Sequence, residues 1–286
     1  MAIDVAPPPA PAASNEGRVS DPESRPAPRQ PPRRAAHALP AAGLALLLLA
    51  TWEAGVRALG VPTYLLPAPS AVGRALGELS GALAGHTLAT MVTATTGLAV
   101  AAVAGVALAV AIRSLPLVRR VLYPLLVVSQ TIPMVVLAPL LVAWFGFGIG
   151  PKIGVVALVS FFPVVVSTVD GLDGAEPELV DVVVSMGASR AALLRHVLLP
   201  AALPGFFAGL AIAATYAMVG AVIAEWMGAS SGLGLLITRS AASFRVDRVF
   251  AGVAVVAAVS VALFAAVRLL ARLAMPWTAA RSEERR

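Results

Sequence analysis

The stretch DVVVSMGASRAALLRHVLLPAALP, residues 181–204, decides the fold because it places charges and a glycine inside a chain of long apolar segments. Residues 177–186 begin with proline, carry acids in their early turns and repeat apolar side chains at helical spacing. Gly187 predicts the end of that helix, and Ser189 predicts the cap of a second helix over residues 190–199, stopped by the proline that follows. We therefore predict a pair of short helices with too few apolar residues to cross a membrane.

The chain as a whole has the composition of a membrane protein. Of its 286 residues, 59% are apolar and 13% are charged, whereas a soluble domain carries about a quarter charged residues. A mean hydropathy of +0.88, with 24 Gly and 23 Pro, indicates several membrane helices joined by short connections. The absence of cysteine excludes disulfides, thiolate metal sites and cysteine nucleophiles.

Six segments are apolar and long enough to cross a hydrocarbon core of about 30 Å at about 1.5 Å per residue. They are residues 41–60, 88–112, 121–146, 152–171, 203–226 and 249–271. We therefore predict an all-α membrane protein with six transmembrane helices, in which residues 38–275 form one domain.

The two ends of the chain read as tails. Residues 1–37 are rich in Pro, Ala and Arg, show no apolar periodicity and are predicted to be disordered. A cleaved signal peptide is the alternative, but an apolar region that starts only beyond residue 40 is late for one, so an uncleaved first span is preferred. Residues 276–286 are predicted to form the second tail.

The distribution of basic residues orients the predicted helices. If residues 1–40 lie in the cytoplasm, the only members of the 21 Lys and Arg that face outward are Arg57, Arg74, Lys152, Arg239, Arg245 and Arg248. The positive-inside rule favours this arrangement. We therefore expect both termini, and the connection over residues 172–202, on the cytoplasmic side of the membrane.

At residues 181–200 the sequence resembles the permease subunits of bacterial ATP-binding cassette (ABC) importers that work with a soluble binding protein, the type I or MetI-like architecture. Their EAA loop consists of an acid, two small residues, three free positions, a glycine, nine free positions, an aliphatic residue, a free position and Leu-Pro. The chain has this register in Asp181, Val182, Val183, Gly187, Val197, Leu199 and Pro200. The departure is DVV where the family has EAA, and the two β-branched valines slightly weaken the helix.

The resemblance implies that residues 172–202 form a coupling-helix hairpin that docks into a groove on a separate ATPase subunit. Gly187, Ala188 and Ser189 would form its turn, and Arg190 would meet polar or acidic groups of the partner. The resemblance further implies two ATPase subunits that carry ATP and Mg²⁺, an extracytoplasmic binding protein, and a second permease copy, most simply the same chain. The permease itself would hold no cofactor and catalyse no reaction.

The resemblance runs from about residue 64 to about residue 270 and is strongest from SQTIPMVVLAPLLVAWFGFG to GAVIAEWMGASSGLGLL. These phrases are most similar to the branch that serves nitrate, sulfonates, taurine and thiamine-precursor pyrimidines. Three phrases are most similar to the pyrimidine-precursor members: QTIPMVVLAPLLVAWFGFG, FFPVVVSTVDGL and RSAASFRVDRVF. The resemblance thus implies import of a small solute, with a pyrimidine as the first candidate and nitrate, sulfonate or taurine as alternatives.

Two other interpretations stay open. The helix pair is also typical of an amphipathic hairpin that lies on lipid headgroups, and the chain as a whole is compatible with a secondary transporter that needs no ATPase. The chain has no G-x-x-x-x-G-K-[ST] loop, and its lone lysine, Lys152, follows no such glycine-rich run. ATP therefore cannot bind to this chain in that way, which agrees with ATP hydrolysis by another polypeptide.

An acidic cluster over residues 170–181, DGLDGAEPELVD, is the feature closest to a metal site. It lacks the second half, a glycine followed by paired aspartates, that a two-metal headgroup transferase would need. We interpret these acids as negative charge at the start of a helix and at a polar exit from the membrane, and we expect no metal there. None of the three histidines stands beside a candidate nucleophile, so acid–base catalysis has no support.

Charged residues inside the spans need an explanation, because each costs roughly 2.5 to 3.5 kcal/mol near the bilayer centre. Glu53 has Arg57 one turn away, which predicts a structural i,i+4 pair. Glu225 ends the fifth span beside Trp226, which predicts interfacial anchoring, with a share in an outer gate as the alternative.

Polar residues inside the spans suggest where a solute crosses, because transporter sites tend to lie near the membrane midplane between broken helices. Pro133 is expected to kink the third span and to expose the polar groups beside it. The predicted substrate pathway, suited to a small planar ligand, consists of Gln130, Thr131, Phe161, Tyr216 and Glu225. The alternative is that such polar groups hold helices together.

Overall fold

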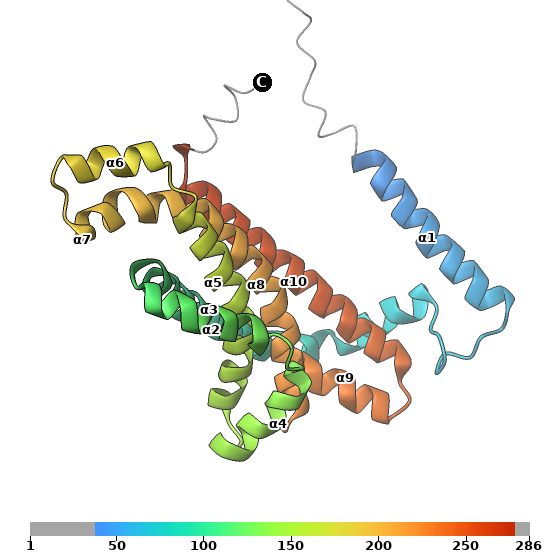
Figure 1. Ribbon diagram of the computed structural model, residues 1–286. Coiled ribbons are helices and arrows are strands. Elements are labelled where there is room, and N and C mark those ends of the chain that lie inside the picture. The colour runs from blue at the N-terminus through green and yellow to red at the C-terminus, as the bar shows by residue number, and fades with distance from the viewer. Residues whose placement is uncertain (1–37, 278–286) are drawn as a thin grey trace, which may run out of the picture. The chain divides into compact units, whose positions relative to one another are not determined.

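The computed structural model describes residues 38–277, and within that range it contains helices and turns but no β-strand (Figure 1). This confirms the all-helical prediction. The tail predicted to be disordered, residues 1–37, and residues 278–286 of the second tail lie outside the described residues. Contacts divide the chain into two units, residues 1–48 and 49–286, and the contacts that define the fold lie within the second.

Ten α-helices and one π-helical segment follow one another along residues 38–277. They are α1 (Ala38–Ala58), α2 (Pro69–Ser114), α3 (Pro116–Ser129), α4 (Met134–Phe145), α5 (Ile149–Asp173), α6 (Pro177–Ser185), α7 (Arg190–Leu193), the π-helical segment Leu194–Leu198, α8 (Leu199–Trp226), α9 (Leu233–Ala242) and α10 (Val246–Ala274).

Four helices within residues 38–277 are long and apolar enough to cross a membrane. They are α2, α5, α10 and the continuous helical segment Arg190–Trp226, which includes α8. These helices confirm the predicted spans over residues 88–112, 152–171, 203–226 and 249–271. α1 has 21 residues and overlaps the first predicted span, residues 41–60, as far as Ala58.

The third predicted span, residues 121–146, is wrong as a single helix. α3 and α4 are separate helices bent by 102° relative to each other. Pro133 lies between them in an extended conformation, with ψ of 124°. Proline has no N–H to donate and its ring crowds the carbonyl one turn earlier, so the expected kink becomes a complete break.

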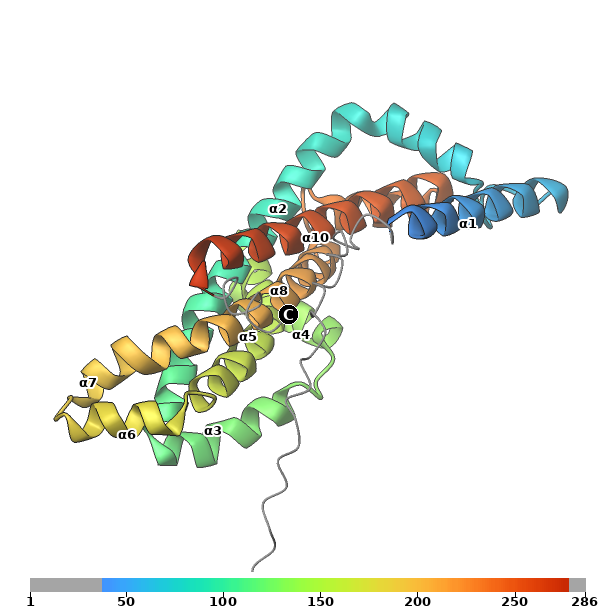
Figure 2. The same ribbon diagram turned by 90° about the horizontal axis from the view of Figure 1, so that it is seen from above.

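α2 is much longer than the second predicted span. It has 46 residues, which at about 1.5 Å per residue gives about 69 Å. Residues 69–87, predicted to be part of a connection, are therefore helical. Figure 2 shows that α2 changes direction along its length, so its first turns do not run parallel to its remainder.

The start of α2 is fixed by the side chain of Glu53. Its carboxylate accepts hydrogen bonds from the backbone N–H of Ser70 (2.9 Å) and from the Ser70 hydroxyl (2.8 Å), and it also pairs with Arg57. The capping residue of α2, Ala68, makes no side-chain hydrogen bond, so Glu53 satisfies an N–H group that the first helical turn leaves free. The predicted structural pair of Glu53 and Arg57 is confirmed.

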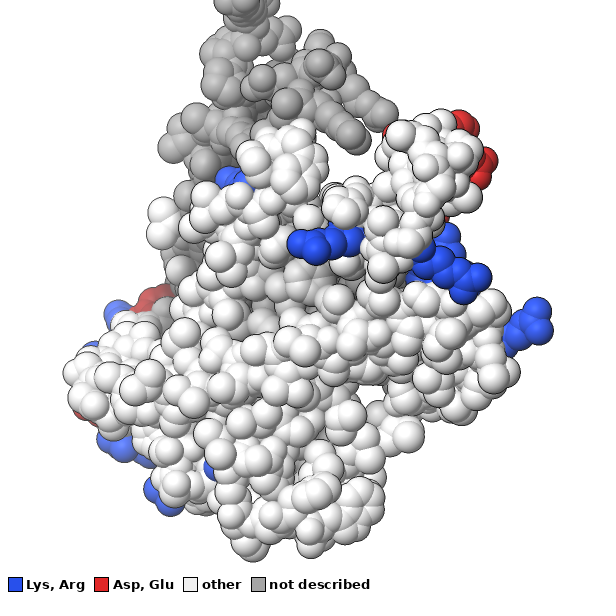
Figure 3. All heavy atoms as spheres, turned by 90° about the vertical axis from the view of Figure 1, so that its left-hand side faces the viewer, with Lys and Arg blue, Asp and Glu red and all other residues white. Residues whose placement is uncertain are grey.

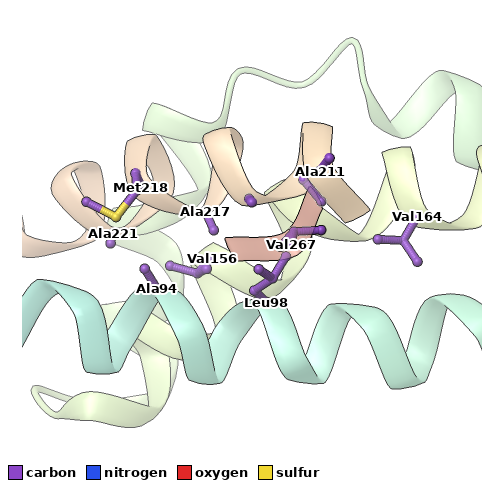
Figure 4. Packing of buried hydrophobic residues seen from close by; sticks show 11 residues of the cluster. Ala94, Leu98, Val156, Val164, Ala211, Ala217, Met218, Ala221 and Val267 are labelled. Atoms are coloured by element: carbon purple, nitrogen blue, oxygen red, sulfur yellow. The ribbon is translucent and has the colours of Figure 1, made fainter. Parts of the chain in front are cut away.

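The core forms where α5 packs against both α2 and α8, with α10 against the same two helices. Figure 4 shows the shared cluster, to which α8 contributes mainly alanine and α5 contributes Val156 and Val164. Small residues let the helices approach closely. A Cβ atom on Gly97 would lie 2.5 Å from Cβ of Val156, and one on Gly209 would lie 2.5 Å from the carbonyl oxygen of Pro163. Both positions therefore require glycine.

The N-terminus of α9 is held by side chains from α2 and α8. The residue that caps α9, Gly232, has no side chain to offer. Three consecutive N–H groups donate instead to other helices: Gly232 to His86 Nδ1 (3.0 Å), Leu233 to Thr90 Oγ1 (2.8 Å) and Gly234 to Glu225 Oε2 (2.7 Å). These bonds satisfy donors that the first turn of a helix leaves free.

Glu225 lies at the centre of this network and is only 1% exposed. The Thr90 hydroxyl donates to its second carboxylate oxygen at 2.7 Å. The predicted interfacial anchoring of Glu225 is therefore wrong. Its carboxylate turns into the protein because the N-terminus of α9 presents N–H donors and partial positive charge there.

We expect Glu225→Ala to loosen α9, because the Gly234 N–H loses its acceptor in a buried site and the Thr90 hydroxyl keeps only the carbonyl of His86 as an acceptor. A buried polar group without a partner costs about 1–3 kcal/mol. The check is amide hydrogen exchange across residues 232–242 of the purified chain, together with its thermal unfolding midpoint.

The matched control for this experiment is Glu78→Ala. The Glu78 side chain is 56% exposed and lies 3.5 Å from its partners Arg245 and Arg248, so its removal should change little. Equal protection of α9 in both variants would show that the Glu225 network does not hold this helix.

Candidate functional site

Two short helical arms project from one end of the helical bundle (Figures 1 and 2). We call α6, α7 and the π-helical segment together, residues 177–198, the hairpin. α6 has proline in its first turn and the acidic Glu178 directly after it, as the sequence predicts. The helix pair expected from residues 177–199 is therefore present.

The turn between the two arms depends on the backbone conformation of Gly187. Its φ of +81° lies in the left-handed region that favours glycine. The N–H groups of Gly187 and Ala188 bond back to carbonyls of α6 at 2.9 and 3.3 Å. Ser189 Oγ accepts a hydrogen bond from the N–H of Ala192 at 3.2 Å. The predicted glycine turn and serine cap are both confirmed.

The predicted end of the second arm at Pro200 is wrong. α7 continues through the π-helical segment into α8 without a break, giving one helical segment from Arg190 to Trp226. Pro200 cannot donate an N–H and would crowd the carbonyl one turn earlier. The wider π turn accommodates this, since the N–H of Leu199 bonds to the carbonyl of Leu194, five residues back. The second arm is thus continuous with a membrane span.

The residues assigned to ATPase coupling by the resemblance lie mostly on the surface. Asp181, Gly187, Ser189, Arg190 and Pro200 are exposed, and Ala188 and Leu199 are half-buried. α6 also exposes Leu179 (48%) and Val182 (55%), and Met186 follows it at 81%. Their spacing of three and four residues places them on one face. An exposed apolar face of this kind is typical of a surface that a partner covers.

Asp173, at the end of α5, ties the base of the hairpin to the corner between α2 and α3. Arg113 Nε lies 3.2 Å from one of its carboxylate oxygens, and Arg119 Nη2 lies 2.9 Å from the other. These groups are partly exposed, so each pair contributes less than about 1 kcal/mol. Within residues 38–277, no group of three His, Cys, Asp or Glu lies close enough together to hold a metal ion.

The five residues predicted to form the substrate pathway lie in three environments. Gln130 and Thr131 are exposed at the break between α3 and α4. Phe161 is half-buried and packs against an interior cluster, and Tyr216 is 47% exposed on α8. Only Glu225 is fully buried, in the network at α9. Ser160, beside Phe161, donates to the carbonyl of Ala213 on α8 (3.3 Å), as the helix-joining alternative predicts.

Sequence reasoning missed a cavity of about 650 Å³ between the start of α5, α2 and the connection before α9. Lys152, Thr93, Ser230 and Ser231 supply polar groups to its lining. Lys152 also lies close enough to the buried Glu225 for their charges to attract. The available signal was that Lys152 is the only lysine of the chain, placed at the start of a membrane span.

Comparison with known proteins identifies the family. Residues 101–275 match the family described as "Binding-protein-dependent transport system inner membrane component". A formylaminopyrimidine transport permease protein of Halalkalibacterium halodurans is 38% identical over 233 residues, covering 81% of this chain and 93% of that protein. A riboflavin transport system permease protein of Chloroflexus aurantiacus is 37% identical over 245 residues, covering 84% and 91%. A taurine transport system permease protein of Escherichia coli is 31% identical over 240 residues, covering 82% and 87%.

A solved structure described as "Crystal structure of an amino acid ABC transporter with histidines" agrees in fold. It aligns with a TM-score of 0.55 and 16% identity over 69% of this chain and 94% of that chain, a likeness that shows the fold alone. The family match and the three relatives each extend over more than half of the chain. The chain therefore belongs to the binding-protein-dependent transport system inner membrane component family, the multi-pass permeases of ABC importers.

Proposed function

We propose that this permease carries a small planar heteroaromatic solute across the inner membrane, delivered by an extracytoplasmic binding protein and driven by two separate ATPase subunits. The observation that carries the proposal is the hairpin with an exposed apolar face and a second arm continuous with α8. A push on such a hairpin reaches a membrane span without passing through a flexible loop.

The proposed cycle is alternating access in a pair of permeases. One chain has one hairpin, and a pair of ATPases needs two, so two copies of this chain are the simplest assembly. Closure of the ATPases on ATP draws the hairpins together and opens the pathway outward, and hydrolysis restores the inward-facing state. The docked binding protein supplies the solute while the pathway is open outward.

The charge distribution supports a cytoplasmic position for the hairpin. Several basic side chains lie close together on one face of the molecule (Figure 3). Arg113 and Arg190 line a cavity at the hairpin, and Arg119 pairs with Asp173 near its base. Cytoplasmic ends of spans carry an excess of Lys and Arg. With the hairpin in the cytoplasm, both termini of the chain lie there too.

The solute is proposed from the relatives. The permeases at 38% and 37% identity are named for formylaminopyrimidine and riboflavin, and both solutes contain planar nitrogen heterocycles. A pyrimidine that serves as a thiamine precursor is therefore the first candidate. Sulfonate and taurine are the second candidate, because permeases named for them are 32% and 31% identical.

The coupling role predicts that two substitutions at Gly187 differ in their effect on ATP hydrolysis. No atom lies within 4 Å of a Cβ placed there, but the left-handed backbone costs most side chains about 1–2 kcal/mol, and asparagine tolerates it best. We expect Gly187→Val to lower the ATP hydrolysis stimulated by loaded binding protein by roughly tenfold, a change equal to about 1.4 kcal/mol. Gly187→Asn should keep most of this activity in the reconstituted importer.

A valine at Gly77, in α2, serves as the control for that experiment, since a Cβ there also meets no atom within 4 Å. Gly77→Val should leave stimulated hydrolysis near the wild-type rate. If Gly187→Val couples as well as the wild type, the hairpin turn has no part in coupling.

The proposed solute predicts which ligand stimulates the importer. In proteoliposomes that contain the permease pair and its ATPases, binding protein loaded with formylaminopyrimidine should raise ATP hydrolysis and uptake above the ligand-free level. Stimulation by taurine and not by the pyrimidine would favour the second candidate. Ion-driven uptake by proteoliposomes that hold this chain alone would favour a secondary transporter.

A further inference from the structure

A cavity of about 560 Å³ lies between the hairpin and the corner where α2 meets α3. Figures 1 and 2 show the hairpin beside this corner. The polar residues that line the cavity include Arg113, Ser114 and Arg190. Its apolar lining includes Leu115, Leu193 and Leu194. The cavity therefore combines positive charge with hydrocarbon surface.

The positive charge of this cavity exceeds what the neighbouring carboxylate can neutralise. Asp173 is shared between Arg113 and Arg119, at 3.2 and 2.9 Å. Arg190 makes no ion pair with any residue of the described range 38–277. Figure 3 shows several basic side chains close together on one face of the molecule. Guanidinium groups arranged in this way suit the oxygen atoms of a phosphate.

The apolar lining opens onto exposed hydrocarbon surface. Leu115, in the cavity wall, is 53% exposed, and the nearby Leu117 on α3 is 74% exposed. None of the residues of α3 is buried in this chain. A free phosphate ion gains nothing from such leucines, whereas a phospholipid carries a phosphate and acyl chains on the same molecule.

We propose that this cavity binds an anionic phospholipid, with Arg113 and Arg190 contacting the headgroup phosphate and the leucines contacting the first acyl carbons. Basic pockets between membrane helices bind lipids of this class. The bound lipid joins the second arm of the hairpin to the corner of α2 and α3. The proposal assigns Arg190 to a lipid in place of the ATPase contact that the family resemblance implied for it. The site goes beyond the proposed transport function and does not depend on the identity of the solute.

The test measures lipid binding by the full-length chain, purified in detergent, with phosphatidylglycerol and phosphatidylcholine as probes in native mass spectrometry. The wild type should bind phosphatidylglycerol more tightly than phosphatidylcholine. Arg190→Gln should weaken phosphatidylglycerol binding about fivefold, which corresponds to about 1 kcal/mol for one basic residue near the surface. Arg190→Lys keeps the charge and should restore most of the affinity.

The matched control is Arg120→Gln, which removes an exposed arginine of α3 that does not line this cavity. Phosphatidylglycerol binding by this variant should stay within twofold of the wild type. An equal loss in Arg190→Gln and Arg120→Gln would overturn the proposal, since the lipid would then follow surface charge in general.

Inorganic phosphate tests whether the cavity binds a phospholipid headgroup or a free phosphate ion, because both offer phosphate oxygens. Millimolar phosphate should leave phosphatidylglycerol binding unchanged if the acyl chains contribute as proposed. Displacement of the lipid by phosphate would assign the cavity to a free anion and overturn the lipid assignment. A wild-type gel-filtration profile of Arg190→Gln shows that its loss of lipid is not a loss of fold.

Discussion

A helix that ends within the hydrocarbon of a membrane must find partners for its terminal N–H and C=O groups inside the protein, because hydrocarbon offers none. In this permease the partners come from distant segments. Glu53 of α1 binds the start of α2, and Glu225, Thr90 and His86 bind the start of α9. Residues that are charged or polar in an otherwise apolar sequence are thereby committed to joining helices. The position of the short helix α9 depends on these bonds.

The same requirement explains how the hairpin is attached. Its second arm passes into α8 through a π-helical turn that accommodates Pro200, so the backbone hydrogen bonds continue from the hairpin into the membrane span. Its base is held at Asp173 by arginines of α2 and α3. α8 in turn packs against α5 at Gly209, where no side chain fits. A displacement of the hairpin is therefore passed to the close-packed spans, which supports the proposed coupling.

Sequence alone predicted the elements that depend on local signals. The four long spans follow from apolar length, and the glycine turn and serine cap follow from residues next to them in the chain. The errors arose where distant contacts decide. α2 extends back to Pro69 because Glu53 caps it, and the carboxylate of Glu225 is buried because α9 folds back over it. The helix through Pro200 continues because a π turn precedes the proline.

The hairpin is confirmed by the structure, whereas the substrate pathway stays a prediction. The hairpin residues lie within one continuous stretch, so their spacing in the sequence predicts how the two helices and the turn are arranged. Gln130, Phe161 and Tyr216 were grouped by their expected depth in the membrane, and depth does not say which way a side chain turns. The 102° break between α3 and α4 changes the direction of Gln130 and Thr131 relative to a straight span. Lys152 was predicted to face outward and to lack an ATP-binding loop, and no local signal indicated that it lines a cavity.

The most direct test of the central claim is whether the tip of the hairpin touches an ATPase. The chain has no cysteine, so Met186→Cys, at a position that is 81% exposed, gives a single reactive site. In the assembled importer this cysteine should cross-link to the ATPase subunit with a short thiol-reactive linker, whereas Tyr64→Cys, at a position that is 58% exposed, should not. Cross-linking from Tyr64→Cys alone, or from neither position in an importer that hydrolyses ATP, would contradict the coupling role of the hairpin.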